Sequence, residues 1–512
     1  MPTSLLQYEM LPTTWFYLSS LIILAIFFRF NRFWSVRNLD LIGLVLFGPG
    51  LIWLAMSDDT GGYIWLLVVT FLISFRLLFD NIMSRRPLLE PNLTPGGLGF
   101  ACFFLLAFVA AALLVNRNEM IDTERTLRLE QVLTARHIMK NQGMNPKTLT
   151  FPPEELANLP PGYRPFWSIV EQMNLILAPP KNIYDRIIPP PLPPTEDGSS
   201  DSNEGIPTSA ESESTVAIPP PLREESALPT GGIVPSTPTS VQSPLVPKSS
   251  ESESEQSQSA DEPFIAPAKT GTIFLTMSLA IGGHFLMALG FLCFGHLHFG
   301  NIRTGVSCAA LYLLLPYTNQ MVGRLDHLIP AVLLLWAFIL YRRPIFSGLL
   351  IGTAAALVTY PMALVPLWIS FYWKKGAVRF IIGVSFAMTA FVFLLFFSPA
   401  SLGTYMDQLL HLFGKSALMI FSRPEGIWTW DDMIYRMPVM SAYFVLCFGL
   451  FLWPSHKNLG TLIACSTLLL LTVQFWQLHQ GGLYMAWYLP PLILTVFRPN
   501  LEDRVAQSSV VV

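Results

Sequence analysis

Charged residues are scarce in this chain, at 13% of its 512 residues, whereas a soluble globular domain usually carries about 25%. Cysteine is scarce too: the five cysteines form no CxxC pair and no metal-ligand spacing, and all fall inside apolar stretches. There they behave as small buried hydrophobic residues. No basic patch is present. These absences argue against an ordinary soluble domain, a cysteine-ligated metal site and a nucleic-acid-binding surface.

Long apolar runs are what the chain has in abundance. Apolar residues make up 52% of it and form roughly a dozen runs, several of which approach the ~20 residues that span a hydrocarbon core. Leu98–Val115, Val378–Ser398 and Leu459–Trp476 are almost free of charge. The chain start lacks a basic region and a cleavage site, so Thr13–Phe28 is expected to be a retained helix. The sequence predicts an all-α, polytopic transmembrane helical bundle.

Basic residues between the apolar runs predict the topology, because Lys and Arg accumulate in cytoplasmic loops. Arg29, Arg32 and Arg37 follow the first run, so the N-terminus is expected outside and the C-terminus, near Arg498 and Arg504, inside. Alternation gives about eleven crossings of the plasma membrane. The expected crossings are Thr13–Phe28, Leu39–Met56, Tyr63–Phe79, Leu98–Val115, Thr272–Phe294, Thr304–Thr318, Leu328–Tyr341, Val378–Ser398, Pro438–Trp453, Leu459–Trp476 and Leu483–Phe497.

One further apolar run, Ile345–Trp373, is expected to be a hairpin. As a helix it would be about 43 Å long, too long for one upright span and short for two. Basic pairs flank it on both sides, at Arg342-Arg343 and at Lys374-Lys375. Both ends are therefore expected inside, with the hinge at Thr359-Tyr360-Pro361.

A hydrophilic segment, Asn116–Thr270, interrupts the runs and is expected to lie outside. Its first part has helix-like periodicity, whereas its second part is rich in Pro, Ser and Glu and is expected to be disordered. The expected division is 1–115, the N-terminal membrane segment; 116–188, an extracytoplasmic helical segment; 189–270, a disordered linker; 271–498, the C-terminal membrane bundle; and 499–512, a cytoplasmic tail.

Polar and aromatic residues gather in the loops predicted to lie outside. They are Asp58 and Asp59; Arg324, Asp326 and His327; Trp428, Trp430, Asp431 and Asp432; and His479. Carboxylates suit acid–base work, Arg and His suit phosphate binding, and tryptophan rings suit the faces of sugars. Because these loops share one predicted side, the clusters are expected to converge on one outward cavity. No metal site is predicted.

Each cluster also has a structural interpretation. The acidic pair after the second run fits a solvated turn, and Arg324 with Asp326 fits an ion pair at helix ends. Trp428 and Trp430 fit the aromatic belt at the level of the lipid headgroups. His479 fits a polar turn. The functional interpretation depends on the convergence of these clusters on one side.

Two stretches resemble the GT-C membrane glycosyltransferases, in particular the polyprenol-phosphate-sugar-dependent mannosyltransferases. Leu314–Asp326, which reads LLPYTNQMVGRLD, resembles their polar outer turn between two spans. Arg342–Ala356, which reads RRPIFSGLLIGTAAA and is followed by Tyr360-Pro361, resembles their basic turn, small-residue helix and hinge. The small residues of Ser347–Gly352 also fit helix packing.

The resemblance implies transfer of a sugar from a polyprenyl-phosphate donor to an acceptor at the outer membrane face. In such enzymes a carboxylate after the first core span acts as general base, which by position is Asp58 or Asp59. The family usually has a long loop there and this chain has a short turn, so Asp326 is the alternative base. Arg324 and His327 are expected to stabilise the leaving phosphate.

The other outer residues are expected to bind substrate: Trp428, Trp430, Asp431, Asp432 and His479. The partners implied are membrane lipid and a polyprenyl-phosphate sugar, with no nucleic acid. No organic cofactor is implied, and the need for a divalent cation is left open.

Two other classes of function remain as alternatives. A transporter or flippase for a lipid-linked or amphipathic substrate would have ionisable residues in mid-membrane and repeated halves with broken helices. His284 is such a residue, but the sequence has no convincing internal repeat. A non-catalytic membrane scaffold would use its disordered segment to bind partners.

Overall fold

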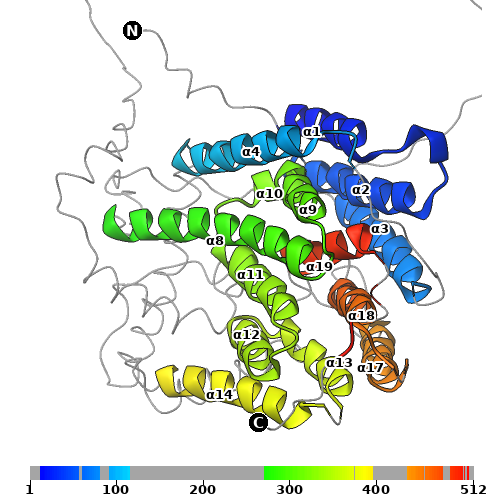
Figure 1. Ribbon diagram of the computed structural model, residues 1–512, viewed down its shortest axis with the longest axis vertical. Helices are drawn as coiled ribbons and strands as arrows, with labels where there is room; N and C mark the ends of the chain where they lie inside the picture. The colour runs from blue at the N-terminus through cyan, green and yellow to red at the C-terminus, as the bar shows by residue number, and fades with distance from the viewer. Residues whose placement is uncertain are drawn as a thin grey trace, which may run out of the picture. The chain divides into compact units, whose positions relative to one another are not determined.

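The computed structural model describes residues 12–56, 60–80, 91–115, 270–373, 375–395, 435–454, 456–476, 485–499, 501 and 504–506. Within these ranges the chain forms helices joined by turns, with one isolated bridge between Asn458 and Val505 (Figure 1). The N-terminal elements are α1 (Pro12–Phe27), η2 (Phe30–Arg32), α2 (Val36–Met56), α3 (Thr60–Leu78) and α4 (Pro95–Val115). The predicted all-α fold class is confirmed for this part of the chain.

The second helical stretch begins at Thr270. Its first elements are α8 (Thr270–Leu297), α9 (Ile302–Leu314), α10 (Pro316–Gln320), α11 (Leu325–Ile339), α12 (Pro344–Leu357), η5 (Tyr360–Ala363), α13 (Leu364–Phe371) and α14 (Ala377–Leu395). Its last elements are α17 (Arg436–Leu452), α18 (Leu459–Thr472), η8 (Val473–Phe475) and α19 (Met485–Phe497). Each run expected to cross the membrane therefore contains at least one helix.

Among the described residues, five helices are long and apolar enough to cross a membrane. Their apolar windows are Val36–Trp53, Gly61–Leu78, Pro95–Leu114, Leu275–Leu297 and Ala377–Leu394. The other apolar helices of the described residues are 10–17 residues long. This set of helices agrees with an integral membrane protein, and the prediction of apolar, membrane-type helices is confirmed at that level.

The expected crossing Thr304–Thr318 is not one continuous helix. It breaks at Leu315, whose backbone is extended (φ −62°, ψ 134°), so α9 ends before Pro316 and α10 begins there. Proline has no N–H and disfavours helical geometry in the residue before it, which accounts for the break. The expected span is therefore divided into one longer and one very short helix.

The predicted hairpin Ile345–Trp373 is present as a chain that folds back on itself. Val358 has an extended backbone, and η5 begins at Tyr360 beside Pro361, so the break lies at the expected hinge. The Tyr372 hydroxyl, just after α13, donates to Ser347 Oγ near the start of α12 at 3.4 Å. The two ends of the segment therefore lie close together, and their predicted position on the inner side stays a prediction.

Small residues allow α12 and α14 to pack closely (Figure 1). Gly348 and Gly352 of α12 face the backbone of α14 at Phe380 and Val384, so closely that an added Cβ would clash. Gly383 of α14 faces the backbone of α12 in the same way. The helix-packing interpretation of the small residues in Ser347–Gly352 is confirmed.

The helical stretches before and after the hydrophilic segment belong to one compact unit. Buried charges join them: Arg76 of α3 donates to Asp80 Oδ1 at 2.6 Å and to Asp40 Oδ2 of α2 at 2.8 Å. Asp80, whose side chain is fully buried, also pairs with Arg498 after α19. Because a buried charge is costly without a partner, this network fixes the two stretches against each other.

Several turns meet at the same end of the helices as this network. His298, between α8 and α9, contacts Ile339 O at the end of α11 through Nε2 at 2.9 Å. Lys457, between α17 and α18, donates to Ser370 Oγ of α13 at 2.8 Å. Arg504 interacts electrostatically with His298, and its carbonyl accepts from Leu459 N at 2.7 Å. These are the turns that the basic residues predicted to lie inside.

Burial sets the ionisation of the polar groups in these turns. Burial, with the nearby charges of Arg342 and Arg504, lowers the pKa of His298 to about 4, against the opposing effect of the hydrogen bond to Ile339. Burial also lowers the pKa of Lys457. His298 is therefore neutral at physiological pH and acts as a structural hydrogen-bonding group.

Candidate functional site

A cluster of buried polar and aromatic side chains surrounds His327 in the first turn of α11. The Tyr317 hydroxyl of α10 lies 2.5 Å from His327 Nδ1, and both residues are at most 3% exposed. The rings of His327 and Trp487 have centroids 6.4 Å apart, and those of Trp487 and Tyr360 have centroids 4.6 Å apart. The cluster thus joins α10 and α11 to α19 and to the hinge in η5.

A buried arginine extends the cluster towards α17 and η8. Arg436, the first residue of α17, donates from Nε to Trp476 O at 2.7 Å, and its guanidinium lies 5.9 Å from the Trp476 ring centroid. It also interacts electrostatically with Tyr360. Arg436 supplies a buried cation beside aromatic rings, and Tyr317 and His327 supply polar atoms nearby. Together they give this end of the helices the polar character that phosphate or sugar recognition needs.

His284 of α8 holds the turn that carries the cluster. One ring nitrogen, Nε2, lies 3.0 Å from Val322 O, and the other, Nδ1, lies 2.9 Å from the Tyr312 hydroxyl. Since a carbonyl only accepts, Nε2 carries the proton and Nδ1 accepts from Tyr312. Thr318 Oγ1 donates to Tyr312 O at 2.6 Å. His284, a residue considered for transport, has both nitrogens engaged in these contacts.

The turn after α10 places Arg324 at the N-cap of α11. Its side chain is half-buried, and its backbone carbonyl accepts from the N–H groups of His327 and Leu328. The positive end of the α11 dipole and the Arg324 guanidinium both favour an anion near this turn. Arg324 and His327 are three positions apart at the start of α11, and their role in phosphate binding stays a prediction.

Other predicted site residues fall outside this description. Asp326 lies in the first turn of α11, but its side chain is outside the described residues. The remaining predicted site residues lie entirely outside the described residues: Asp58, Asp59, Trp428, Trp430, Asp431, Asp432 and His479. Their convergence on one cavity stays a prediction.

Sequence reasoning missed several members of the cluster. Tyr317 lies in the Leu314–Asp326 stretch and Tyr360 in the predicted hinge, yet neither was predicted to belong to a site. Trp487 lies within an apolar run and carries no sequence signal of its own. Arg436 did carry a sequence signal. It is a basic residue at the edge of an apolar run on the predicted outer side, whereas Lys and Arg usually accumulate in cytoplasmic loops.

In comparisons with known proteins, no family model, no curated protein and no solved structure matches the chain.

Proposed function

We propose that the protein is an integral membrane glycosyltransferase that moves a sugar from a polyprenyl-phosphate donor to an acceptor at the outer membrane face. The position of Trp487 supports this most. Its ring lies beside His327, next to the Leu314–Asp326 turn, and beside Tyr360 in the hinge. The two stretches that resemble GT-C enzymes thus meet at one buried side chain.

The topology that we propose has about eleven crossings and one hairpin in the plasma membrane. The N-terminus and residues 116–270 lie outside, and the C-terminus lies inside. Support comes from the gathering of turns: His298, Lys457 and Arg498 mark one end of the helices, whereas His327, Tyr360 and Arg436 gather elsewhere. The first set belongs to predicted inner turns. In the second set His327 and Arg436 belong to predicted outer loops, and Tyr360 belongs to the predicted hinge of the hairpin.

In the proposed chemistry an aspartate takes the proton of the acceptor hydroxyl, whose oxygen forms a bond to the anomeric carbon of the sugar. The bond from that carbon to the phosphate oxygen breaks, and the polyprenyl phosphate leaves as an anion. The candidate bases are Asp58, Asp59 and Asp326. Arg324, His327 and the positive end of α11 stabilise the charge that develops on the phosphate. Trp428 and Trp430 pack on the sugar, and the polar residues Asp431, Asp432 and His479 hold its hydroxyls.

The test is transfer of radiolabelled sugar from a synthetic polyprenyl-phosphate sugar to endogenous acceptors in membranes that contain the full chain. Replacement of the true base, by Asp58→Asn, Asp59→Asn or Asp326→Asn, lowers transfer about 100-fold or more at unchanged expression. Arg324→Gln lowers transfer as well. Full activity in all three aspartate variants would remove the proposed mechanism.

Two controls sharpen this experiment. Arg379→Gln removes an exposed arginine at the start of α14, on the predicted inner side, and leaves transfer unchanged. The proposal requires no organic cofactor. Addition of a chelator tests whether it requires a divalent cation. Loss of transfer that Mg²⁺ or Mn²⁺ restores indicates a divalent cation at the phosphate, and full transfer indicates that side chains alone neutralise it.

Transport is a second candidate, favoured by the broken helices α9–α10 and α12–η5–α13. Interrupted spans with exposed backbone groups often bind substrate in transporters. A scrambling assay with a fluorescent polyprenyl-phosphate lipid in proteoliposomes distinguishes the two. Translocation of the lipid without sugar transfer would favour the flippase. In that case translocation would be lost in variants of the α9–α10 break such as Pro316→Ala.

A further inference from the structure

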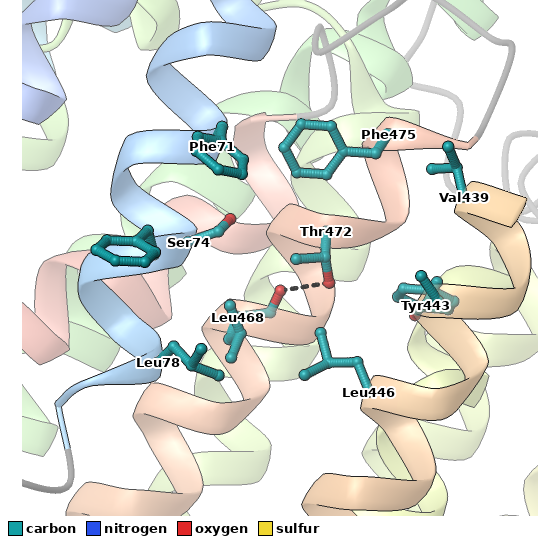
Figure 2. Close-up of a pocket in the computed structure, with 11 residues that line it drawn as sticks. Phe71, Ser74, Leu78, Val439, Tyr443, Leu446, Leu468, Thr472 and Phe475 are labelled. Atoms are coloured by element: carbon teal, nitrogen blue, oxygen red, sulfur yellow. Dashed lines mark hydrogen bonds between the residues drawn. The ribbon is translucent and has the colours of Figure 1, made fainter.

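An apolar groove lies between α3, α17 and α18 (Figure 2). Its volume is about 340 Å³. Each helix contributes large apolar side chains to its walls, among them Phe71, Phe75, Val439, Tyr443, Leu446 and Leu468. The groove thus joins a helix from before the hydrophilic segment to two helices from near the end of the chain.

Few polar atoms line the groove, and the Ser74 Oγ atom, which has no hydrogen-bond partner among the described residues, is itself buried. Thr472 Oγ1 donates to Leu468 O within α18 at 2.7 Å, a bond drawn in Figure 2. Such a bond satisfies the hydroxyl within its own helix. Ser74, on the α3 wall, is only 7% exposed. A ligand in the groove therefore meets hydrocarbon and aromatic surface, and it needs no hydrogen-bonding groups of its own.

The surface around the groove is apolar as well. Phe71 and Phe75 of α3 are 59% and 56% exposed, and Phe444 and Phe448 of α17 are largely exposed. Apolar side chains on the outer faces of membrane helices face the lipid tails. The groove therefore opens towards the hydrocarbon of the bilayer.

The volume of the groove decides between a lipid chain and a protein helix. A cavity of about 150 Å³ holds a benzene molecule, so 340 Å³ holds roughly a dozen carbon atoms. Three turns of an α-helix about 10 Å wide occupy roughly 1,200 Å³. A single hydrocarbon chain fits within the groove, whereas a transmembrane helix would place only some of its side chains there.

A cation lies beyond one end of the groove. Arg436 precedes the wall residues Val439 and Tyr443 by three and seven positions, so all of them share one stripe of α17. Arg436 bonds to Trp476, whose ring packs against Tyr443 at a centroid distance of 5.7 Å. The positive charge is therefore one helical turn beyond the apolar wall, which is where the headgroup of a bound chain would lie.

We propose that the groove binds one acyl chain of a membrane phospholipid whose anionic headgroup lies near Arg436. The lipid fills the space between α3, α17 and α18 and strengthens the contact between the two helical stretches. Arg436 also borders the cluster around His327. The inference does not rest on glycosyl transfer, because the ligand is a bulk membrane lipid on which no reaction takes place.

The experiment is native mass spectrometry of the full chain in detergent after addition of phosphatidylglycerol or phosphatidylcholine. The wild type retains about one phosphatidylglycerol and less phosphatidylcholine, and phosphatidylglycerol raises its thermal midpoint by a few degrees. Ala442→Trp fills the groove, so the bound lipid and the thermal gain are lost. Val445→Trp is the matched control, since Val445 is on the same helix, is 71% exposed and does not line the groove.

Two further variants test the headgroup and the occupant. Arg436→Lys keeps the preference for phosphatidylglycerol. Arg436→Gln reduces the amount of bound phosphatidylglycerol to the level of bound phosphatidylcholine. A photoreactive residue in place of Ala442 forms an adduct with phospholipid in native membranes. This test identifies the occupant while the groove stays open. An adduct with a second copy or another protein, or equal lipid loss in Val445→Trp and Ala442→Trp, overturns the proposal.

Discussion

The Tyr317 hydroxyl lies 2.5 Å from His327 Nδ1, and this contact joins α10 to α11 across the turn that carries Arg324. Both side chains are buried, so the contact is made away from water. A buried hydrogen-bonding group that loses its partner costs about 1–3 kcal/mol. The pair therefore contributes to the stability of the turn as well as to the chemistry proposed for it.

Tyr317→Phe is expected to destabilise the protein by about 1–3 kcal/mol, because it removes the hydroxyl that contacts His327. The measurement is a double-mutant cycle with His327→Gln, scored by thermal unfolding in detergent. The coupling energy is expected to be about 0.5–3 kcal/mol. Thr467→Val is the control, since the Thr467 hydroxyl bonds only to Ile463 O of its own helix. Strictly additive effects would show that the two residues act separately.

His284→Phe is expected to destabilise more than Tyr312→Phe. The histidine replacement removes the contacts to both Tyr312 and Val322, whereas the tyrosine replacement removes only one. The expected losses are about 2–5 and 1–3 kcal/mol. His284→Gln, which keeps a side-chain donor, is intermediate. A variant that keeps wild-type thermal stability but abolishes proton-coupled transport would instead identify His284 as a proton carrier.

Asp80→Asn is expected to cost about 3–5 kcal/mol, because it removes a buried carboxylate that pairs with Arg76 and Arg498. Thermal unfolding measures the loss. The double variant Asp80→Asn/Arg498→Met regains part of it, since it also removes one of the cations. If Asp80→Asn alone is as stable as the wild type, the network does not fix α3 against α19.

The hinge and the hairpin could be predicted from the sequence, because their causes are local. Pro361 lacks the N–H group that would continue a helix, and basic pairs flank the run on both sides. The Asp80–Arg498 pair could not be predicted, since its partners are 418 residues apart and neither has a distinguishing neighbour. The same holds for Trp487, whose contact with Tyr360 depends on how η5 and α19 pack.

The candidate site was predictable only where charge marked it. Arg324 and His327 stood out because they interrupt an apolar region, and the structure joins them in one turn. Tyr317 and Tyr360 are amphipathic residues that occur both in cores and in sites, so composition did not separate these roles. Arg436 could have been found by asking which basic residues depart from the bias towards inner loops.

His298 is expected to make the stability of the protein depend on pH. Its pKa is lowered to about 4 by burial, whereas an unfolded histidine titrates near 6.5, so the unfolded state binds the proton more readily. Stability is therefore full above about pH 6.5 and falls as the pH drops towards 4, by up to about 3 kcal/mol. Thermal midpoints in detergent at pH 7.5, 6.5, 5.5 and 4.5 measure this slope.

His298→Gln is the variant that isolates this contribution, because glutamine donates to Ile339 O without titrating. It is expected to lower stability at pH 7.5 slightly and to flatten the slope between pH 6.5 and 4.5. His456→Gln is the matched control: His456 is exposed in the turn before α18, so the slope stays that of the wild type. If His298→Gln loses as much stability on acidification as the wild type, other groups cause the acid sensitivity.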